Sequence, residues 1–146
     1  MTIEDNKALV NRFVDEFWSS GNELAADQFM ADGVTIVVND RLVEDTVALK
    51  GFARMLRSAF PDWRSDLEEL VGEDDRVAER WTGRGTHASD FQGIQATGRQ
   101  VAVPGTVFYR IAAGKIVEFR GQFDRLSMLE QLGALPQPVG AEVSAR

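Results

Sequence analysis

The stretch RQVAVPGTVFYRIAAGKIVEFRGQF, residues 99–123, decides the fold of this chain. Apolar and polar residues alternate along both of its halves, which is the period of a strand with one buried face. Ala113 and Gly114 separate the halves and suit a tight hairpin connection. The stretch therefore predicts two antiparallel strands, at residues 99–111 and 116–123.

Further strands are predicted on the N-terminal side of this hairpin. Residues 63–71 and 76–87 also alternate, and the acidic pair at residues 74–75 suits a second tight connection. A β-branched run at residues 34–38 predicts one more short strand. The four long strands follow one another directly, so we expect them to form an antiparallel meander.

Glycine and proline inside these strands predict a bent sheet. Gly83 and Gly85 lie in one predicted strand, and Pro104 and Gly105 lie in the next. Such residues inside strands usually mark bulges or sharp bends. Bends side by side in neighbouring strands would curl the sheet around the elements that pack on its inner face.

Helical signals dominate the chain before residue 61 and return after residue 123. Apolar residues recur at three- and four-residue spacing between Leu9 and Trp18, which predicts an amphipathic helix. Three more helices are expected, near residues 24–30, over residues 47–60 and over residues 126–132. The residues that begin or end the helices are Thr2 with Asp5, Gly21, Asp45, Pro61, Asp124 and Gly133.

Helices followed by a meander of strands predict an α+β fold with the helices on one face of one sheet. The strongly curved antiparallel sheet and the N-terminal helices would form a cone around an apolar pocket. Residues 1–133 are expected to be a single domain. Residues 134–146 contain two prolines and no periodicity, so we expect a flexible C-terminal tail.

Composition narrows the partners and the chemistry. The 146 residues carry a net charge of −7, which disfavours nucleic acid as a partner. The chain has no cysteine, and His87 is its only histidine, so neither thiol chemistry nor a multi-histidine metal site is expected within one chain. A polar, acidic N-terminus and the lack of a long apolar run predict a cytoplasmic protein without a membrane partner.

Short motifs in a consistent order connect the chain to a known family. They are AFPDW at residues 59–63, DRVA at 75–78, RWT at 80–82, GTH at 85–87, FQGI at 91–94 with TGR at 97–99, GKIVE at 114–118 and LEQLG at 129–133. Through them the chain, from about residue 7 to residue 136, resembles the SnoaL-like polyketide cyclases within the NTF2-like and ketosteroid-isomerase-like superfamily. The resemblance implies a deep apolar pocket, no cofactor or metal, and a homodimer formed through the open sheet face.

The same resemblance identifies what this chain lacks. Aldol cyclases of the family carry an acid–base aspartate midway along the last strand and a histidine on the strand beside it. The matching positions here are Gly121 and Val107, and a position that is often polar on the first strand is Val37. Aldol closure needs a positioned proton acceptor, so that mechanism does not carry over to this chain.

Glu79 is the principal catalytic candidate. Val77 and Trp81 flank it at a spacing of two, so its carboxyl would share their buried face. Burial would raise the pKa of this carboxyl and make it a usable acid or base near neutral pH. The alternative is a local twist of the strand that pairs Glu79 with Arg80, Arg110 or Arg120 in a dimer face.

Asp124 and His87 are the other two catalytic candidates, and each has a structural alternative. Asp124 is either a carboxylate at the end of the pocket or the N-cap of the last helix. His87 is either a proton shuttle or the partner of a structural hydrogen bond to the following loop.

The expected substrate-binding wall is mostly apolar. Tyr109 is either a donor to a substrate carbonyl or a core tyrosine with a satisfied hydroxyl. Phe91 is expected either to cover the pocket mouth or to pack at an interface. The complete set is Tyr109, Trp81, Phe17, Trp63, Phe119, Gly121, Val107, Val37 and Phe91.

Three functions are compatible with this pattern. The first is a cofactor-independent cyclase or isomerase of natural-product biosynthesis, which closes a ring in a bulky apolar polyketide-like substrate by a pericyclic, C–O or C–C step. The second is a non-catalytic binding protein for a small apolar metabolite. The third is an epoxide hydrolase or hydroxylase of the same fold. A buried Glu79 favours the first, because an unpaired buried carboxylate is costly in a passive binder.

Overall fold

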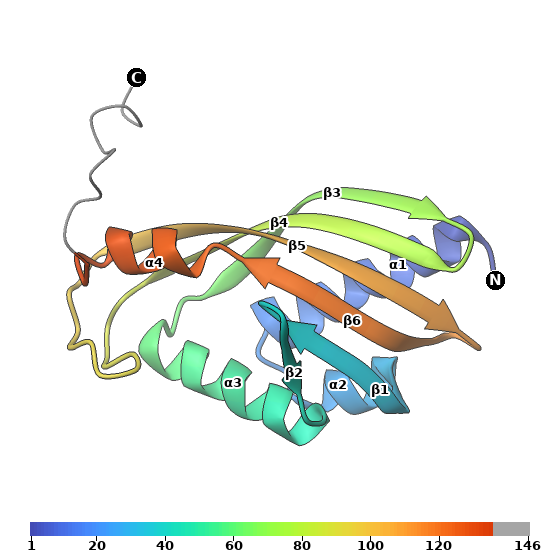
Figure 1. Ribbon diagram of the computed structural model, residues 1–146, viewed down its shortest axis with the longest axis horizontal. Coiled ribbons are helices and arrows are strands. Elements are labelled where there is room, and N and C mark those ends of the chain that lie inside the picture. The colour runs from blue at the N-terminus through green and yellow to red at the C-terminus, as the bar shows by residue number, and fades with distance from the viewer. Residues whose placement is uncertain (136–146) are drawn as a thin grey trace.

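Six strands form one sheet in the order β2-β1-β6-β5-β4-β3 in the computed structural model, which describes residues 1–135 (Figure 1). The expected tail at residues 134–146 therefore lies almost entirely outside the described residues. The elements are α1 (Ile3–Phe13), the π-helix η1 (Val14–Ser19), α2 (Leu24–Phe29), β1 (Met30–Val38), β2 (Arg41–Val43), α3 (Thr46–Ala59), β3 (Arg64–Glu73), β4 (Arg76–Thr86), β5 (Gln100–Ala112), β6 (Lys115–Phe123) and α4 (Arg125–Gln131).

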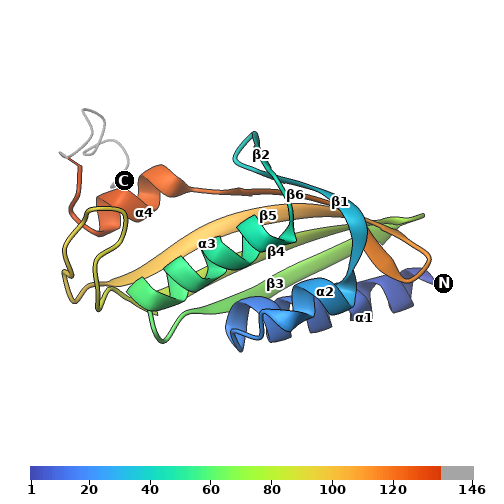
Figure 2. The same ribbon diagram turned by 90° about the horizontal axis from the view of Figure 1, so that it is seen from below.

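The α+β prediction is confirmed. Strands β3 to β6 form the expected antiparallel meander. Helices α1, α2 and α3 lie on one face of the curved sheet, and α4 continues from the end of β6 (Figures 1 and 2). No helix within residues 1–135 is long and apolar enough to cross a membrane.

Strand β1 joins the sheet in a way that the sequence did not predict. It pairs in parallel with β6, and it also pairs with the short, unpredicted strand β2. The register places Ile36 beside Phe119 and Val38 beside Gly121. This pairing adds β1 to the last strand of the meander and extends the inner face of the sheet.

The helix signals act as predicted. Thr2 and Asp5 form a reciprocal capping box at the start of α1, with both hydrogen bonds 3.0 Å long. Asp45 accepts a hydrogen bond from the backbone N–H of Ala48 and begins α3. One difference follows Phe13, where the first helix continues as a π-helix rather than as one α-helix to Gly21.

The alternation that predicted β5 and β6 holds fully in β5 and only partly in β6. Every second residue of β5 from Val101 to Ile111 is buried. In β6 the register shifts where Ile111 pairs with Ile116, so Ile116 is buried. Val117, which has the same two-residue spacing as Phe119 and Gly121, is only half-buried. The expected inward face resumes at Phe119.

Glycines allow indole rings to lie directly on the sheet. A Cβ atom at Gly83 would overlap the ring of Trp63, and one at Gly105 would overlap the ring of Trp81. The Trp81 ring therefore occupies the space that a side chain at Gly105 would take. The two glycines therefore leave room for two large rings on the concave side, where the buried side chains gather in two hydrophobic clusters.

Candidate functional site

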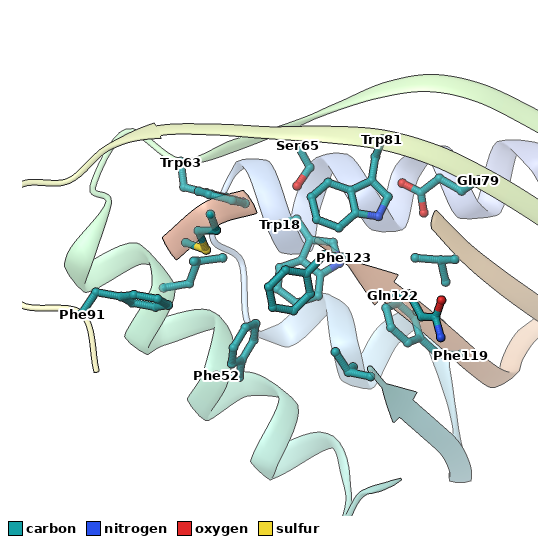
Figure 3. A pocket seen from close by; sticks show the side chains of 15 residues that line it. Trp18, Phe52, Trp63, Ser65, Glu79, Trp81, Phe91, Phe119, Gln122 and Phe123 are labelled. Carbon is teal, nitrogen blue, oxygen red and sulfur yellow. The ribbon is translucent and has the colours of Figure 1, made fainter. Parts of the chain in front are cut away.

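A narrow cavity of about 60 Å³ lies between the concave sheet face and α3. Three of its fifteen lining residues are tryptophans, and these are all the tryptophans in the chain. The side chains converge from η1, α3, α4, the segment before β3, the loop after β4 and five strands (Figure 3). The lining comprises Trp18, Val38, Phe52, Leu56, Trp63, Ser65, Glu79, Trp81, Phe91, Val107, Phe119, Gly121, Gln122, Phe123 and Met128.

One transverse row of the sheet builds the floor of this pocket. Glu79 on β4 pairs with Val107 on β5, Val107 pairs with Gly121 on β6, and Gly121 pairs with Val38 on β1. Paired residues point to the same side of a sheet. Glu79, the only carboxylate of the lining, therefore lies in the same row as Val107 and Gly121. These two positions were matched above to the histidine and the aspartate of the aldol cyclases.

Glu79 is almost completely buried, with 4% of its surface exposed. Burial raises the pKa of its carboxyl to about 7, and a hydrogen bond of 2.7 Å donated by the Tyr109 hydroxyl opposes that rise in part. The carboxyl therefore exchanges a proton near neutral pH, which is the requirement for general acid–base catalysis.

The predicted alternative, in which Glu79 forms an ion pair, does not hold among the described residues. Arg80 instead contacts Glu69 at 3.2 Å, and Arg120 contacts Glu118 at 3.2 Å, on the outer face of the sheet. Since no cation compensates Glu79, its protonation is governed by burial and by Tyr109.

Tyr109 lies behind Glu79 rather than in the pocket wall. Its side chain is 1% exposed, and its ring makes edge-to-face contacts with Phe13 and Phe119 at 6.4 and 5.4 Å between ring centroids. Burial and the nearby Glu79 carboxylate raise the pKa of its hydroxyl well above the usual value. Tyr109 therefore stays protonated and donates to Glu79, which matches the expectation of a satisfied core hydroxyl.

Most of the predicted wall residues do line the pocket, and two are replaced by their sequence neighbours. Phe17 is a core residue that stacks on Phe13 at 5.2 Å, while Trp18 lines the cavity from the wider turn of the π-helix. Val37 faces the outer side of the sheet, and Val38 faces the cavity. The residues that line it as predicted are Glu79, Trp63, Trp81, Phe91, Val107, Phe119 and Gly121.

Asp124 and His87 lie outside the cavity lining. Asp124 is exposed and accepts a hydrogen bond of 2.9 Å from the backbone N–H of Ser127, which makes it the N-cap of α4. His87 is fully buried, stacks on Phe60 and contacts the Thr97 hydroxyl through Nδ1 at 3.0 Å. Both positions match the structural alternatives given for these residues.

Several lining residues were not predicted. Phe123 follows Phe119 and Gly121 at a spacing of two, so the alternation contained that signal, whereas Gln122 falls on the opposite face of the same alternation. Ser65 follows Trp63 at the two-residue spacing of a strand, which is a weak signal for a shared face. The other unpredicted lining residues are Trp18, Val38, Phe52, Leu56 and Met128.

The lining offers little to a metal ion. Among residues 1–135 there is no group of three or more histidine, cysteine, aspartate or glutamate side chains placed to hold one. The polar side chains in the cavity wall are Glu79, Ser65 and Gln122 together with the indole nitrogens of the tryptophans. The arrangement can move a proton at Glu79 and donate hydrogen bonds elsewhere.

Comparison with known proteins identifies close structural relatives. The family model described as SnoaL-like polyketide cyclase matches residues 8–132. The structure of AclR from Streptomyces galilaeus, proposed to be a hydroxylase, superposes with a TM-score of 0.84 at 27% identity, covering 92% of this chain and all of that one. A search of curated proteins found no match.

Two further solved structures have the same fold and similar length. A proposed SnoaL-like polyketide cyclase from Jannaschia sp. CCS1 gives a TM-score of 0.82 at 25% identity, covering 93% of this chain and 97% of that one. A proposed polyketide cyclase from Acidithiobacillus ferrooxidans gives 0.79 at 29% identity, covering 91% and 98%.

Proposed function

The chain belongs to the SnoaL-like polyketide cyclase family, and we propose that it is a cofactor-independent cyclase or isomerase acting on a flat, apolar, polyketide-like metabolite. The pocket wall selects a folded conformer of the substrate, and Glu79 transfers the proton. Holding a flexible chain in a reactive conformer lowers the barrier of a unimolecular ring closure.

Glu79 is the observation that carries this proposal. It is the single carboxylate in a mostly apolar lining, it has no cationic partner within the described residues, and its pKa is raised to about 7. An unpaired buried carboxyl is costly to fold, and perturbed groups of this kind concentrate at catalytic sites. Tyr109 fixes its orientation through the 2.7 Å hydrogen bond.

A C–O ring closure fits a single carboxylate. Glu79 takes the proton of a substrate hydroxyl, and the oxygen attacks the β-carbon of a conjugated ketone. The π-electron pair moves to the α-carbon, and Glu79 returns the proton there. The product is an isomer of the substrate, so the step consumes no oxidant, water or second reactant.

The narrow cavity restricts the shape of the substrate. Three half-buried rings, Trp18, Phe52 and Phe123, border it from three elements. Their centroids lie 6.3 Å apart for Trp18 and Phe52, and 6.4 Å apart for Phe52 and Phe123. In our proposal a substrate larger than the present space enters by rotating these rings, and a planar conjugated system slides between them.

The test compares wild-type protein with Glu79→Gln on a panel of hydroxy-enone polyketide analogues. We expect the wild type to produce an isomer of unchanged mass, and Glu79→Gln to lose at least about a hundredfold of the rate. Glu69→Gln is the control, because Glu69 is exposed on the neighbouring strand and pairs with Arg80. Equal rates for wild type and Glu79→Gln would contradict the proposal.

The similarity to AclR supports a hydroxylase as the second candidate. The same assay separates the candidates by the composition of the product. A hydroxylase adds one oxygen atom, an epoxide hydrolase adds one water molecule, and a cyclase or isomerase leaves the composition unchanged. A binding protein leaves the substrate itself unchanged.

The outer sheet face supports a homodimer as part of the proposal. One transverse row crosses all six strands and contains Val71, Ala78, Phe108, Arg120, Val37 and Leu42. Three members are large apolar side chains with high exposure, namely Leu42 at 75% and Val71 and Phe108 at 56% each. A second copy packed on this face would bury them.

The acidic, cysteine-free chain also supports a cytoplasmic location.

A further inference from the structure

Trp63 carries a buried hydrogen-bond donor that the mechanism above does not use. Its side chain is 5% exposed, and its indole Nε1 has no hydrogen-bond partner among the described residues. Buried N–H groups without an acceptor are rare, because the lost contact with water is not replaced. The ring lines the pocket and points into it (Figure 3).

Ser65 provides a second donor on the same side of the pocket. It lies two residues beyond Trp63, so the two side chains share one face at the start of β3. Its hydroxyl points toward the cavity and makes no hydrogen bond to the described residues (Figure 3). The backbone holds both positions, since Ser65 N–H donates to Ser19 Oγ at 2.9 Å and Trp63 O accepts from Arg57 at 3.2 Å.

The two donors lie at the opposite end of the pocket from Glu79. Ser65 pairs with Gly83 on β4, which is four residues along that strand from Glu79. At roughly 3.3 Å per strand residue, this separates them by about 13 Å. Trp81 lies between Glu79 and Gly83 on β4 and shares their face, so its flat ring connects the Glu79 end of the pocket with the Ser65 end (Figure 3).

We propose that the Trp63 indole N–H and the Ser65 hydroxyl form a donor pair for a carbonyl oxygen of a planar ligand, at the end of the pocket remote from Glu79. The inference rests on the proposed function only in taking this cavity as the ligand site. It deepens that function by naming the substrate class: an extended conjugated diketone or quinone whose reacting hydroxyl and enone lie at the Glu79 end, while a second carbonyl is held by this donor pair.

The three indole N–H groups allow a direct test, because all three tryptophans line the pocket. ¹⁵N-labelled protein is titrated with 2-acetylnaphthalene and, separately, with 2-ethylnaphthalene, two probes of nearly equal shape of which only the first has a carbonyl. Substitution of each tryptophan by phenylalanine assigns the three indole signals. We expect the Trp63 proton to move downfield with the ketone alone, and the Trp18 and Trp81 signals to respond to both probes.

Binding constants for the two probes provide the second measurement. We expect wild-type protein to prefer the ketone by about fivefold to tenfold, the difference of roughly one hydrogen bond. Trp63→Phe and Ser65→Ala should each reduce this preference, which is measured within each variant as the ratio of its binding constants for the two probes. Glu79→Gln should keep the preference, because Glu79 lies at the other end.

Three results would overturn the inference. They are a Trp63 shift that is equal for both probes, a ketone preference that survives in the double variant Trp63→Phe/Ser65→Ala, and the absence of any indole response to either probe. Failure of the proposed catalysis would look different, because the wild type would then keep the ketone preference and form no isomer from the hydroxy-enone panel.

Discussion

The Glu79 carboxyl makes the stability of the folded protein depend on pH. Its pKa of about 7 in the folded state exceeds the ordinary value of 4.5, because burial disfavours the charged form. The folded protein therefore holds this proton more tightly than the unfolded chain. The resulting contribution to stability is fully present below pH 4.5, falls as the pH rises, and is lost above about pH 7.

Glu79→Gln should remove this dependence. The shift corresponds to about 3 kcal/mol of unfolding free energy, so the variant should gain roughly that much relative to the wild type between pH 5 and pH 8. Urea unfolding at several pH values measures the difference, with Glu69→Gln as the exposed control. A stability difference that stays constant with pH would contradict the raised pKa.

Glycines in the central strands leave room for the aromatic rings that pack directly on them. A Cβ at Gly105 would overlap the Trp81 indole, so Gly105→Ala must push that ring into the pocket. We expect a loss of about 1–3 kcal/mol in unfolding free energy, as for other overpacked cores, together with a changed tryptophan fluorescence spectrum.

Gly51→Ala is the matched control for that substitution. Gly51 lies within α3, and no atom stands within 4 Å of the added Cβ. The same change should therefore stabilise the protein by about 0.5–1 kcal/mol, because alanine favours the helix. If Gly105→Ala unfolded at the same denaturant concentration as Gly51→Ala, the close contact with Trp81 would be disproved.

Arg57 connects α3 to the segments that carry two pocket tryptophans. Its Nη2 donates to the carbonyl oxygens of Trp18 at 2.7 Å, Ser19 at 2.7 Å and Trp63 at 3.2 Å. The carbonyl groups of Trp18 and Ser19 lie at the end of the π-helix, where no further helical turn supplies N–H donors. Arg57 supplies the donor instead. Helix α3 thereby fixes the backbone on both sides of the cavity.

Arg57→Ala should cost about 2 kcal/mol in unfolding free energy, because three partly buried carbonyl groups lose a charged donor. Arg54→Ala, one turn earlier on the same helix, changes the net charge equally but removes only an exposed ion pair with Glu23, so it should cost less than about 1 kcal/mol. Thermal melts of the two variants compare these costs. Equal melting temperatures would remove the role assigned to Arg57.

The complete molecule has two very different sheet faces. The inner face is covered by helices α1–α3 (Figure 2). The outer face exposes a transverse row that includes Val71, Phe108 and Leu42. Ion pairs flank this row, such as Arg80 with Glu69 at 3.2 Å and Arg76 with Glu118 at 3.7 Å. A row that is apolar except for Arg120, with charged neighbours on either side, fits a protein interface.

Phe108→Asp should therefore convert the proposed homodimer into a monomer. A charge at the centre of the interface would be desolvated without a partner on the second copy. Size-exclusion chromatography with light scattering measures the mass, and Val47→Asp is the control because Val47 is exposed on α3, away from the sheet face. A wild-type monomer, or a dimer that survives Phe108→Asp, would refute this interface.

The sequence by itself determined which side chains point inward along β4, β5 and most of β6. The two-residue period of a strand is a local property, so the inward direction of Glu79, Val107 and Phe119 could be deduced from their neighbours alone. The caps Thr2, Asp45 and Asp124 were equally predictable, because a capping side chain bonds to a backbone N–H only three residues away.

Only the tertiary structure decided the features that depend on distant contacts. The parallel pairing of β1 with β6 places Val38 rather than Val37 at the pocket, and the π-helix places Trp18 there rather than Phe17. The bond from Tyr109 to Glu79 and the narrowness of the cavity also require the packed sheet and helices. Periodicity reports the face on which a residue lies, whereas the partner it meets and the space left between them depend on segments far apart in the chain.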